Sequence, residues 1–193
     1  YFRPDRLDID SKEIFELASS GTVQDLFQFS TEVGYGAVTH AKPSNMIDLM
    51  ALNSIMRLMN RLGKTPLETF AEFKENIQLW YDEMKEYNLT QDEIHFMEEH
   101  LLKLSGIADT QESAMLLAMD KRMCDFNVQE ATQLRKVIAG SNEKNLRELK
   151  ELIYRKGKEQ GTSENLLNYF WEVQLGAQLG YSFSSSHLLA YTL

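Results

Sequence analysis

Turn-forming residues are scarce in this chain, and this scarcity limits the possible folds more than any other feature. Only three prolines and ten glycines are spread over 193 residues, whereas an all-β chain has to turn about every ten residues. Leucine, methionine, glutamate, lysine, glutamine and alanine, which favour helices, are abundant instead. The pattern predicts an all-α fold, one compact domain of about nine or ten helices.

Capping signals and apolar spacing place these helices along the chain. Asp10-Ser11-Lys12-Glu13 and Thr90-Gln91-Asp92-Glu93 are typical of capping boxes. Ile14, Leu17 and Ala18 recur at helical spacing in the first helix, and Gly21 suits a left-handed cap at its end. The stretch 32–40 is assigned no firm element. Further helices are predicted over residues 22–29, 46–62, 67–87, 90–104, 110–122, 128–139, 142–158 and 163–179.

The apolar content argues against a membrane span and against secretion. The longest wholly apolar run, from Ala114 to Met119, is far shorter than the roughly 20 residues that a spanning helix needs. The first residues lack the basic and apolar regions of a signal peptide. The single cysteine, Cys124, excludes an internal disulfide. We therefore expect no membrane partner and a cytoplasmic location.

Charge is distributed unevenly along the chain. The formal net charge is -9, made up of -4 over residues 1–40, +3 over 41–64, -10 over 65–130 and +2 over 131–193. Two basic helical segments, 41–64 and 131–160, thus flank an acidic helical insertion, 65–105. If the fold brings the basic segments together, one face suits a polyanion, so net charge alone does not exclude DNA.

Three groups of residues carry some potential for chemistry. Asp8-Ile9-Asp10 has a spacing known from magnesium sites, although Asp10 also serves as a helix cap. Asp92, His95 and Glu99, with His100 beside them, offer one edge of a metal site or a solvated acidic face. A Cys124–His187 nucleophile would require the fold to bring the two together. None of these groups is a complete catalytic constellation.

Cations recur at helical intervals in the second basic segment. Such a stripe grips phosphates by charge and, through arginine, by paired hydrogen bonds. The alternative is a solvated surface stripe that Glu143, Glu148 and Glu151 partly neutralise. The cations are Arg135, Lys136, Lys144, Arg147, Lys150, Arg155 and Lys156.

Several strings occur in one order over nearly the whole chain. They are Leu26-Phe27-Gln28-Phe29, Lys42-Pro43-Ser44, Asp48-Leu49-Met50-Ala51-Leu52-Asn53 with Arg57, Gln111-Glu112, Leu134-Arg135-Lys136, and Gly180-Tyr181-Ser182-Phe183-Ser184-Ser185-Ser186-His187. Together they resemble the fingers region of the bacterial DNA polymerase III α subunit, the family C replicative DNA polymerase. Each string alone is weak, but their shared order and spacing make chance an implausible explanation.

The resemblance implies that residues 1–193 are a piece of a larger DNA-directed DNA polymerase. In this family the fingers close over the incoming nucleotide, while a palm domain, absent from this chain, holds Mg²⁺ and forms the 3′–5′ phosphodiester bond. The implied partners are template-primer DNA, dNTP, the palm and other domains of the same polypeptide, and replisome proteins. By position, Arg57, Arg135, Lys136 and His187 would face nucleotide or nucleic-acid phosphates, with His187 equally suited to packing or capping a helix. This chain alone should be inactive and should hold no metal.

The sequence departs from the family pattern at several of these points. Arg57 is followed by Leu58-Met59-Asn60 where the family has Pro-Gly-Pro, and Gly140 by Ser141-Asn142 where lysines are usual. The departures indicate a divergent member and suggest a bacteriophage, replicating in a bacterial cell, as its source. Two other hypotheses stay open: a free-standing helical interaction module without activity, and a helical metal enzyme built around His95.

Overall fold

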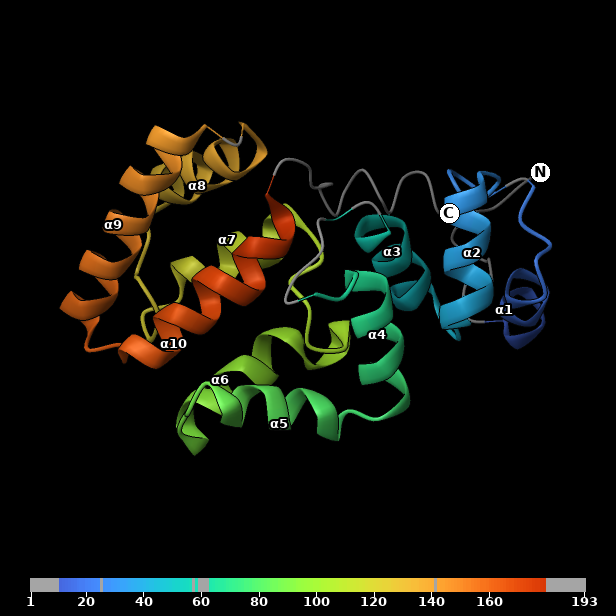
Figure 1. The fold of residues 1–193 in the computed structure, drawn as a ribbon, viewed down its shortest axis with the longest axis horizontal. Helices are drawn as coiled ribbons and strands as arrows, with labels where there is room; N and C mark the ends of the chain where they lie inside the picture. The colour runs from blue at the N-terminus through green and yellow to red at the C-terminus, as the bar shows by residue number, and fades with distance from the viewer. Residues whose placement is uncertain (1–10, 25, 57, 59–62, 141, 180–193) are drawn as a thin grey trace, which may run out of the picture.

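The computed structural model describes residues 11–24, 26–56, 58, 63–140 and 142–179, which form helices joined by short loops (Figure 1). None of these helices is long and apolar enough to cross a membrane. The prediction of an all-α fold is confirmed. The order is α1 (Lys12–Ser19), α2 (Glu32–Ala41), α3 (Met46–Ile55), α4 (Pro66–Glu75), α5 (Gln78–Glu86), α6 (Gln91–Leu101), the short 3₁₀-helix η2 (Leu102–Leu104), α7 (Gln111–Met119), α8 (Val128–Gly140), α9 (Glu143–Gln160), α10 (Glu164–Asn168), the π-helix η3 (Tyr169–Leu175) and the 3₁₀-helix η4 (Gly176–Gln178).

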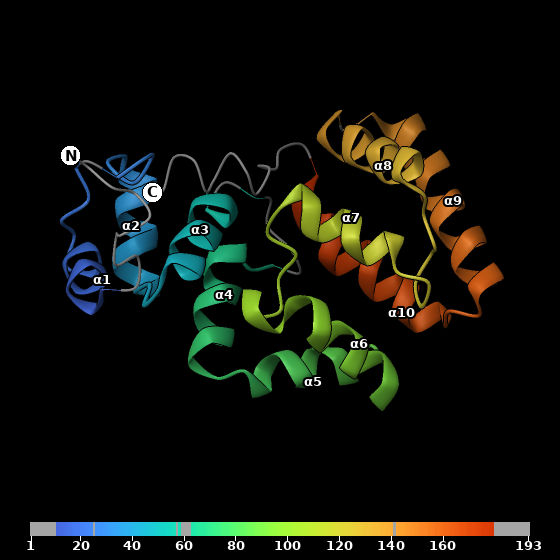
Figure 2. The ribbon, with the colours of Figure 1, turned by 180° about the vertical axis from the view of Figure 1, so that it is seen from behind.

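Buried apolar side chains form two clusters. Helices α1 to α4, with loop residues beside them, supply most of the N-terminal cluster, which includes Phe15, Leu52 and Phe70. The later helices supply the larger C-terminal cluster, which includes Trp80 and Phe170. Both views show α1, α2 and α3 at one end of the molecule and α8, α9 and α10 at the other (Figures 1 and 2). Fully buried side chains of this size each contribute about 1.5–3 kcal/mol to folding.

The capping signals were informative where their side chains are described. Thr90 and Glu93 form the expected capping box: the Thr90 Oγ1 accepts from the Glu93 N–H at 3.4 Å, and the Glu93 Oε2 accepts from the Thr90 N–H at 2.7 Å. Gly21 has the expected left-handed backbone, with φ of +98°. The apolar face predicted for α1 is confirmed only at Ala18, which is buried. Ile14 and Leu17 are about half exposed, and Phe15 is buried instead. Asp8 and Asp10 lie outside the described residues.

The prediction of one continuous helix over 67–87 is wrong. The helix is interrupted between α4 and α5, at Asn76, where φ is -142° and ψ is 91°. The Asn76 Oδ1 accepts a hydrogen bond from the Gln78 N–H at 3.1 Å. An asparagine side chain that bonds the backbone locally competes with helix continuation, so α5 starts afresh.

The segment 22–29 is not the short helix that was expected. Its described residues form successive turns, closed by bonds from the Leu26 N–H to the Val23 carbonyl and from the Phe29 N–H to the Leu26 carbonyl, both 3.1 Å. Gln28 has a left-handed φ of +65°. This loop packs onto α2 at Gly34, where a β-carbon would lie 2.4 Å from the Gln28 carbonyl oxygen. The stretch 32–40, which the sequence left unassigned, is therefore part of helix α2. Gly34 has no side chain, so the loop can pack closely against this helix.

The helix expected over 46–62 is shorter than predicted. Helix α3 ends at Ile55, and Met56 caps it with an N–H bond to the Leu52 carbonyl. Leu58 is buried in the N-terminal cluster outside the helix. Residues 57 and 59–62 lie outside the described residues.

Candidate functional site

Two of the four predicted phosphate-contacting residues lie within the described residues. Arg135 and Lys136 lie on α8, whose buried face is formed by Ala131, Leu134 and Val137. Arg57 and His187 lie outside the described residues, so their roles stay predictions. The two residues that can be placed lie on α8 and close to the helix it packs against, α7.

The guanidinium of Arg135 is held by a glutamine of α7. Arg135 is half-buried, and its Nη1 donates to the Oε1 of Gln111 at 3.2 Å. Gln111 is the first residue of α7, so the start of that helix determines where the acceptor lies. Lys136 is exposed and makes no hydrogen bond or ion pair within the part of the chain that the structure describes. Of these two cations, Arg135 is held by a hydrogen bond to Gln111, and Lys136 extends from the surface without a partner among the described residues.

A buried loop leads into α7. All five residues from Gly106 to Thr110 are buried although they belong to no helix. Thr110 caps α7, its Oγ1 accepting from the Ser113 N–H at 3.3 Å. Burial raises the pKa of the Asp109 carboxyl from 3.8 to about 6, although hydrogen bonds from Ser113 and Thr110 act in the opposite direction. Backbone groups in such a loop must find partners away from water.

Those partners come from two distant helical segments. The Gln174 Oε1 accepts from the Ala108 N–H at 2.8 Å, and its Nε2 donates to the Gly106 carbonyl at 3.0 Å. The Gln178 Nε2 donates to the Ala108 carbonyl at 2.6 Å. From the other side, the Ser54 hydroxyl of α3 donates to the Asp109 carbonyl. Neither glutamine nor Ser54 was singled out from the sequence.

The cations of α9 are largely neutralised within the helix. Lys144 lies 3.8 Å from Glu148, Arg147 lies 3.5 Å from Glu143, and Arg155 lies 3.6 Å from Glu159. Each of these pairs links residues four apart on the exposed surface. The arrangement favours the solvated stripe over a phosphate grip along α9.

Lys156 has a different environment from the other cations of α9. Its Nζ contacts the Glu130 Oε2 of α8 at 2.7 Å and donates to the Asp125 carbonyl at 3.3 Å, with the lysine side chain 18% exposed. Its ion pair also lowers the pKa of Glu130. Lys156 therefore fastens α9 to the start of α8, and its charge is already paired with that of Glu130.

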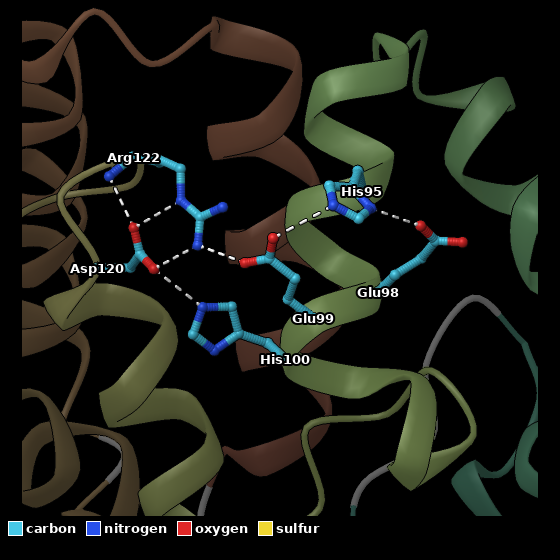
Figure 3. Close-up of polar contacts among 6 residues, drawn as sticks. All are labelled: His95, Glu98, Glu99, His100, Asp120 and Arg122. Carbon is cyan, nitrogen blue, oxygen red and sulfur yellow. Dashed lines mark hydrogen bonds and ion pairs between the residues drawn. The ribbon is translucent and has the colours of Figure 1, made fainter.

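The acidic helix α6 carries a network of charges instead of a metal site. The two ring nitrogens of His95 lie 3.1 Å from Glu98 and 3.3 Å from Glu99, and Arg122 bridges Glu99 and Asp120 at 2.7 and 2.8 Å (Figure 3). Hydrogen bonds from Arg122 hold the pKa of Asp120 well below its usual range. Among the described residues no three His, Cys, Asp or Glu side chains form a group that could hold a metal ion. The hypothesis of a metal enzyme around His95 therefore finds no support.

Cys124 is a packing residue. It is fully buried in the C-terminal cluster, and its Sγ donates to the Ile153 carbonyl at 3.6 Å. Burial raises the pKa of its thiol to about 12. A nucleophilic cysteine needs a depressed pKa and access to substrate, so Cys124 lacks both requirements.

Comparison with known proteins identifies the family of this helical domain. The family model described as "Bacterial DNA polymerase III alpha subunit finger domain" matches residues 1–161. The chain belongs to this family. The match ends shortly before α10, so Gln111, Arg135 and Lys136 of this finger domain fall inside it, whereas Gln174 and Gln178 fall outside.

Full-length relatives extend the likeness of the finger domain to all 193 residues. It is 46% identical over its whole length to a probable DNA polymerase, YorL, of Bacillus subtilis (strain 168), and equally to a DNA-directed DNA polymerase of Bacillus phage SPbeta. It is 26% identical over 98% of its length to the DNA polymerase III subunit alpha of Thermus aquaticus. In each case the chain spans about 15% of the relative's length. The phage relative fits the divergence seen in the motifs.

Proposed function

We propose that this finger domain serves a replicative DNA-directed DNA polymerase by binding the incoming dNTP and the template-primer DNA. In this proposal Arg135 and Lys136 contact phosphates. The supporting observation is the anchored guanidinium of Arg135, half-buried beside the exposed ammonium of Lys136 on one helix. Arginine is always charged and offers a fork that matches phosphate oxygens. One nitrogen bonds Gln111, and the other donors of the fork have no partner among the described residues, so they are available to a ligand in this proposal.

These cations would act on the charge of the triphosphate. In phosphoryl transfer, negative charge grows on the leaving pyrophosphate, and positioned cations stabilise it. Arg57 and His187 keep the same proposed role from the resemblance alone. Other domains of the full polypeptide, the palm above all, would form the phosphodiester bond.

Magnesium belongs to the palm in this proposal, where it would supply Lewis-acid chemistry on the phosphates. The described residues of this chain provide no group able to hold a metal ion. The finger domain would therefore contribute binding and orientation. Accordingly, the isolated chain should bind nucleotide or primed DNA weakly and in a salt-dependent manner.

The test is Arg135→Ala in the full-length polymerase, assayed by steady-state incorporation of a single nucleotide. A lost hydrogen bond to a charged group costs about 1.5–3 kcal/mol, so the KM for dNTP should rise about 10- to 100-fold. Arg147→Ala is the matched control, because its guanidinium is exposed and paired with Glu143 on α9. An unchanged KM and kcat in Arg135→Ala would remove the proposed role.

A second measurement separates the polymerase from the free-standing interaction module. The polymerase hypothesis requires an aspartate-bearing palm in the same reading frame upstream of Tyr1. A start codon directly before Tyr1 would instead support the interaction module. Both outcomes can be read from the gene sequence.

A further inference from the structure

The loop Gly106–Thr110 is built more rigidly than its lack of secondary structure suggests. Gly106 has φ of +76°, and a β-carbon there would lie 2.6 Å from the ring of Trp80. The Trp80 Nε1 donates to the Tyr169 hydroxyl at 3.0 Å, which in turn donates to Glu83 at 2.8 Å. Gln174 adds a bond to the same hydroxyl at 3.2 Å. The loop thus packs closely against the Trp80 ring, which the hydrogen bond to Tyr169 holds in place.

Side chains from α3 and from η3 and η4 hydrogen-bond the backbone of this loop. Ile107 packs in the N-terminal cluster while its neighbour Ala108 packs in the C-terminal cluster. Ser54 fastens the loop from α3, and the two glutamines fasten it from η3 and η4. All three side chains are at most 1% exposed. Apolar residues would fill the same space but leave buried backbone groups unpaired.

This loop leads directly into the residue that holds the Arg135 guanidinium. Thr110 ends the loop, and Gln111, the next residue, accepts the bond from Arg135. Hydrogen bonds weaken steeply with misalignment. A shift of the loop would therefore move the acceptor away and release the half-buried arginine to other rotamers.

We infer that Ser54, Gln174 and Gln178 are positioning residues for phosphate binding, acting through the loop Gly106–Thr110 and Gln111 on Arg135. The inference rests on the proposed function of Arg135. It assigns a role to three buried polar side chains, two of them beyond the region that the family model matches.

The experiment uses Gln178→Met in the full-length polymerase. Methionine has similar length but no donor, so the Ala108 carbonyl loses its partner. The KM for dNTP should rise about tenfold, within the rise expected for Arg135→Ala, because the displaced loop would carry Gln111 away from Arg135; kcat should change much less. Thr162→Ala is the control, because it removes a side-chain donor to backbone carbonyls, those of Arg122 and Met123, away from this loop. It should leave KM unchanged.

A double-mutant cycle with Arg135→Ala distinguishes positioning from general destabilisation. If Gln178 acts through Arg135, adding Gln178→Met to Arg135→Ala should raise KM no further. Multiplying effects, or an unchanged KM in Gln178→Met alone, would overturn the inference while leaving the proposed function intact. An unchanged KM in Arg135→Ala would instead overturn the proposed function.

If Gln178→Met does not fold, two smaller substitutions at Ser54 test the same inference. Ser54→Ala removes the donor to the Asp109 carbonyl, and Ser54→Thr keeps a hydroxyl at the same place. The alanine variant should raise KM for dNTP several-fold and the threonine variant should restore it toward the parent value. Equal KM values for parent, alanine and threonine polymerases would contradict the inference.

Discussion

Replacing Asp109 by asparagine is expected to remove a pH dependence from the stability of the 193-residue chain. The Asp109 side chain is 5% exposed, and burial raises its pKa from 3.8 to about 6. Between these values the folded state keeps a proton that the unfolded state has lost. Stability from this group is therefore present at pH 4 and falls as the pH rises to 6. The difference corresponds to about 3 kcal/mol.

The assay is urea unfolding of parent and Asp109→Asn at pH 4, 5, 6 and 7.5. Asparagine retains an acceptor for Ser113 but carries no charge, so any cost of the substitution is the same at every pH. Other carboxyls are common to both chains and cancel in the difference between their unfolding free energies. That difference should move by about 2.4 kcal/mol in favour of the variant from pH 4 to 7.5, because part of the full 3 kcal/mol is already lost at pH 4. Because the sequence pI is about 5.0, low protein concentration is required. A difference independent of pH would refute the reasoning.

Two further substitutions test the structure around this site. Burial raises the pKa of Asp48, but hydrogen bonds from Lys74 and Ser44 outweigh it and leave the pKa below 3.8. Asp48→Asn should therefore cost about 3 kcal/mol at pH 7, and urea unfolding should show the loss shrinking as the pH falls through the lowered pKa of Asp48. Gly106→Ala should destabilise the chain by about 3 kcal/mol, since it combines a left-handed φ with overlap of the Trp80 ring; an unchanged thermal midpoint would contradict this.

The sequence predicted helices well where a local signal decides the structure. Thr90 and Glu93 satisfy each other within four residues, so their capping box needed no knowledge of the fold. The break at Asn76 was missed because apolar spacing continues across it, from Phe73 to Trp80. The side-chain bond to Gln78 that starts α5 is visible only in three dimensions. The helix at residues 32–40 was missed for a similar reason. A glycine is needed at Gly34 because the loop that ends near Gln28 packs against it, and this contact is not visible in the sequence.

The site was predictable only in part, and for a related reason. Arg135 and Lys136 were predicted because a family motif carries them, and their contact with phosphate stays a prediction. Gln174 and Gln178 left a weaker signal, two amides four residues apart in an otherwise apolar stretch. That spacing places both on one side of a helix, which indicates buried polar partners. The partner loop lies almost 70 residues earlier in the chain, so no local pattern names it.

The cations of the second basic segment illustrate how charge counting and structure diverge. By count, residues 131–160 form a basic segment, and a phosphate grip along the whole stripe was one hypothesis. In the structure, glutamates four residues away neutralise Lys144, Arg147 and Arg155. Lys156 forms an ion pair with Glu130 of α8. Exposed pairs of this kind contribute little to stability, but they reduce the potential that α9 presents to a polyanion. Positive charge that is not paired with a carboxylate among the described residues remains at Lys150 and Lys158 of α9 and at Arg135 and Lys136 of α8. Of these cations, Arg135 already has one guanidinium nitrogen fixed by Gln111.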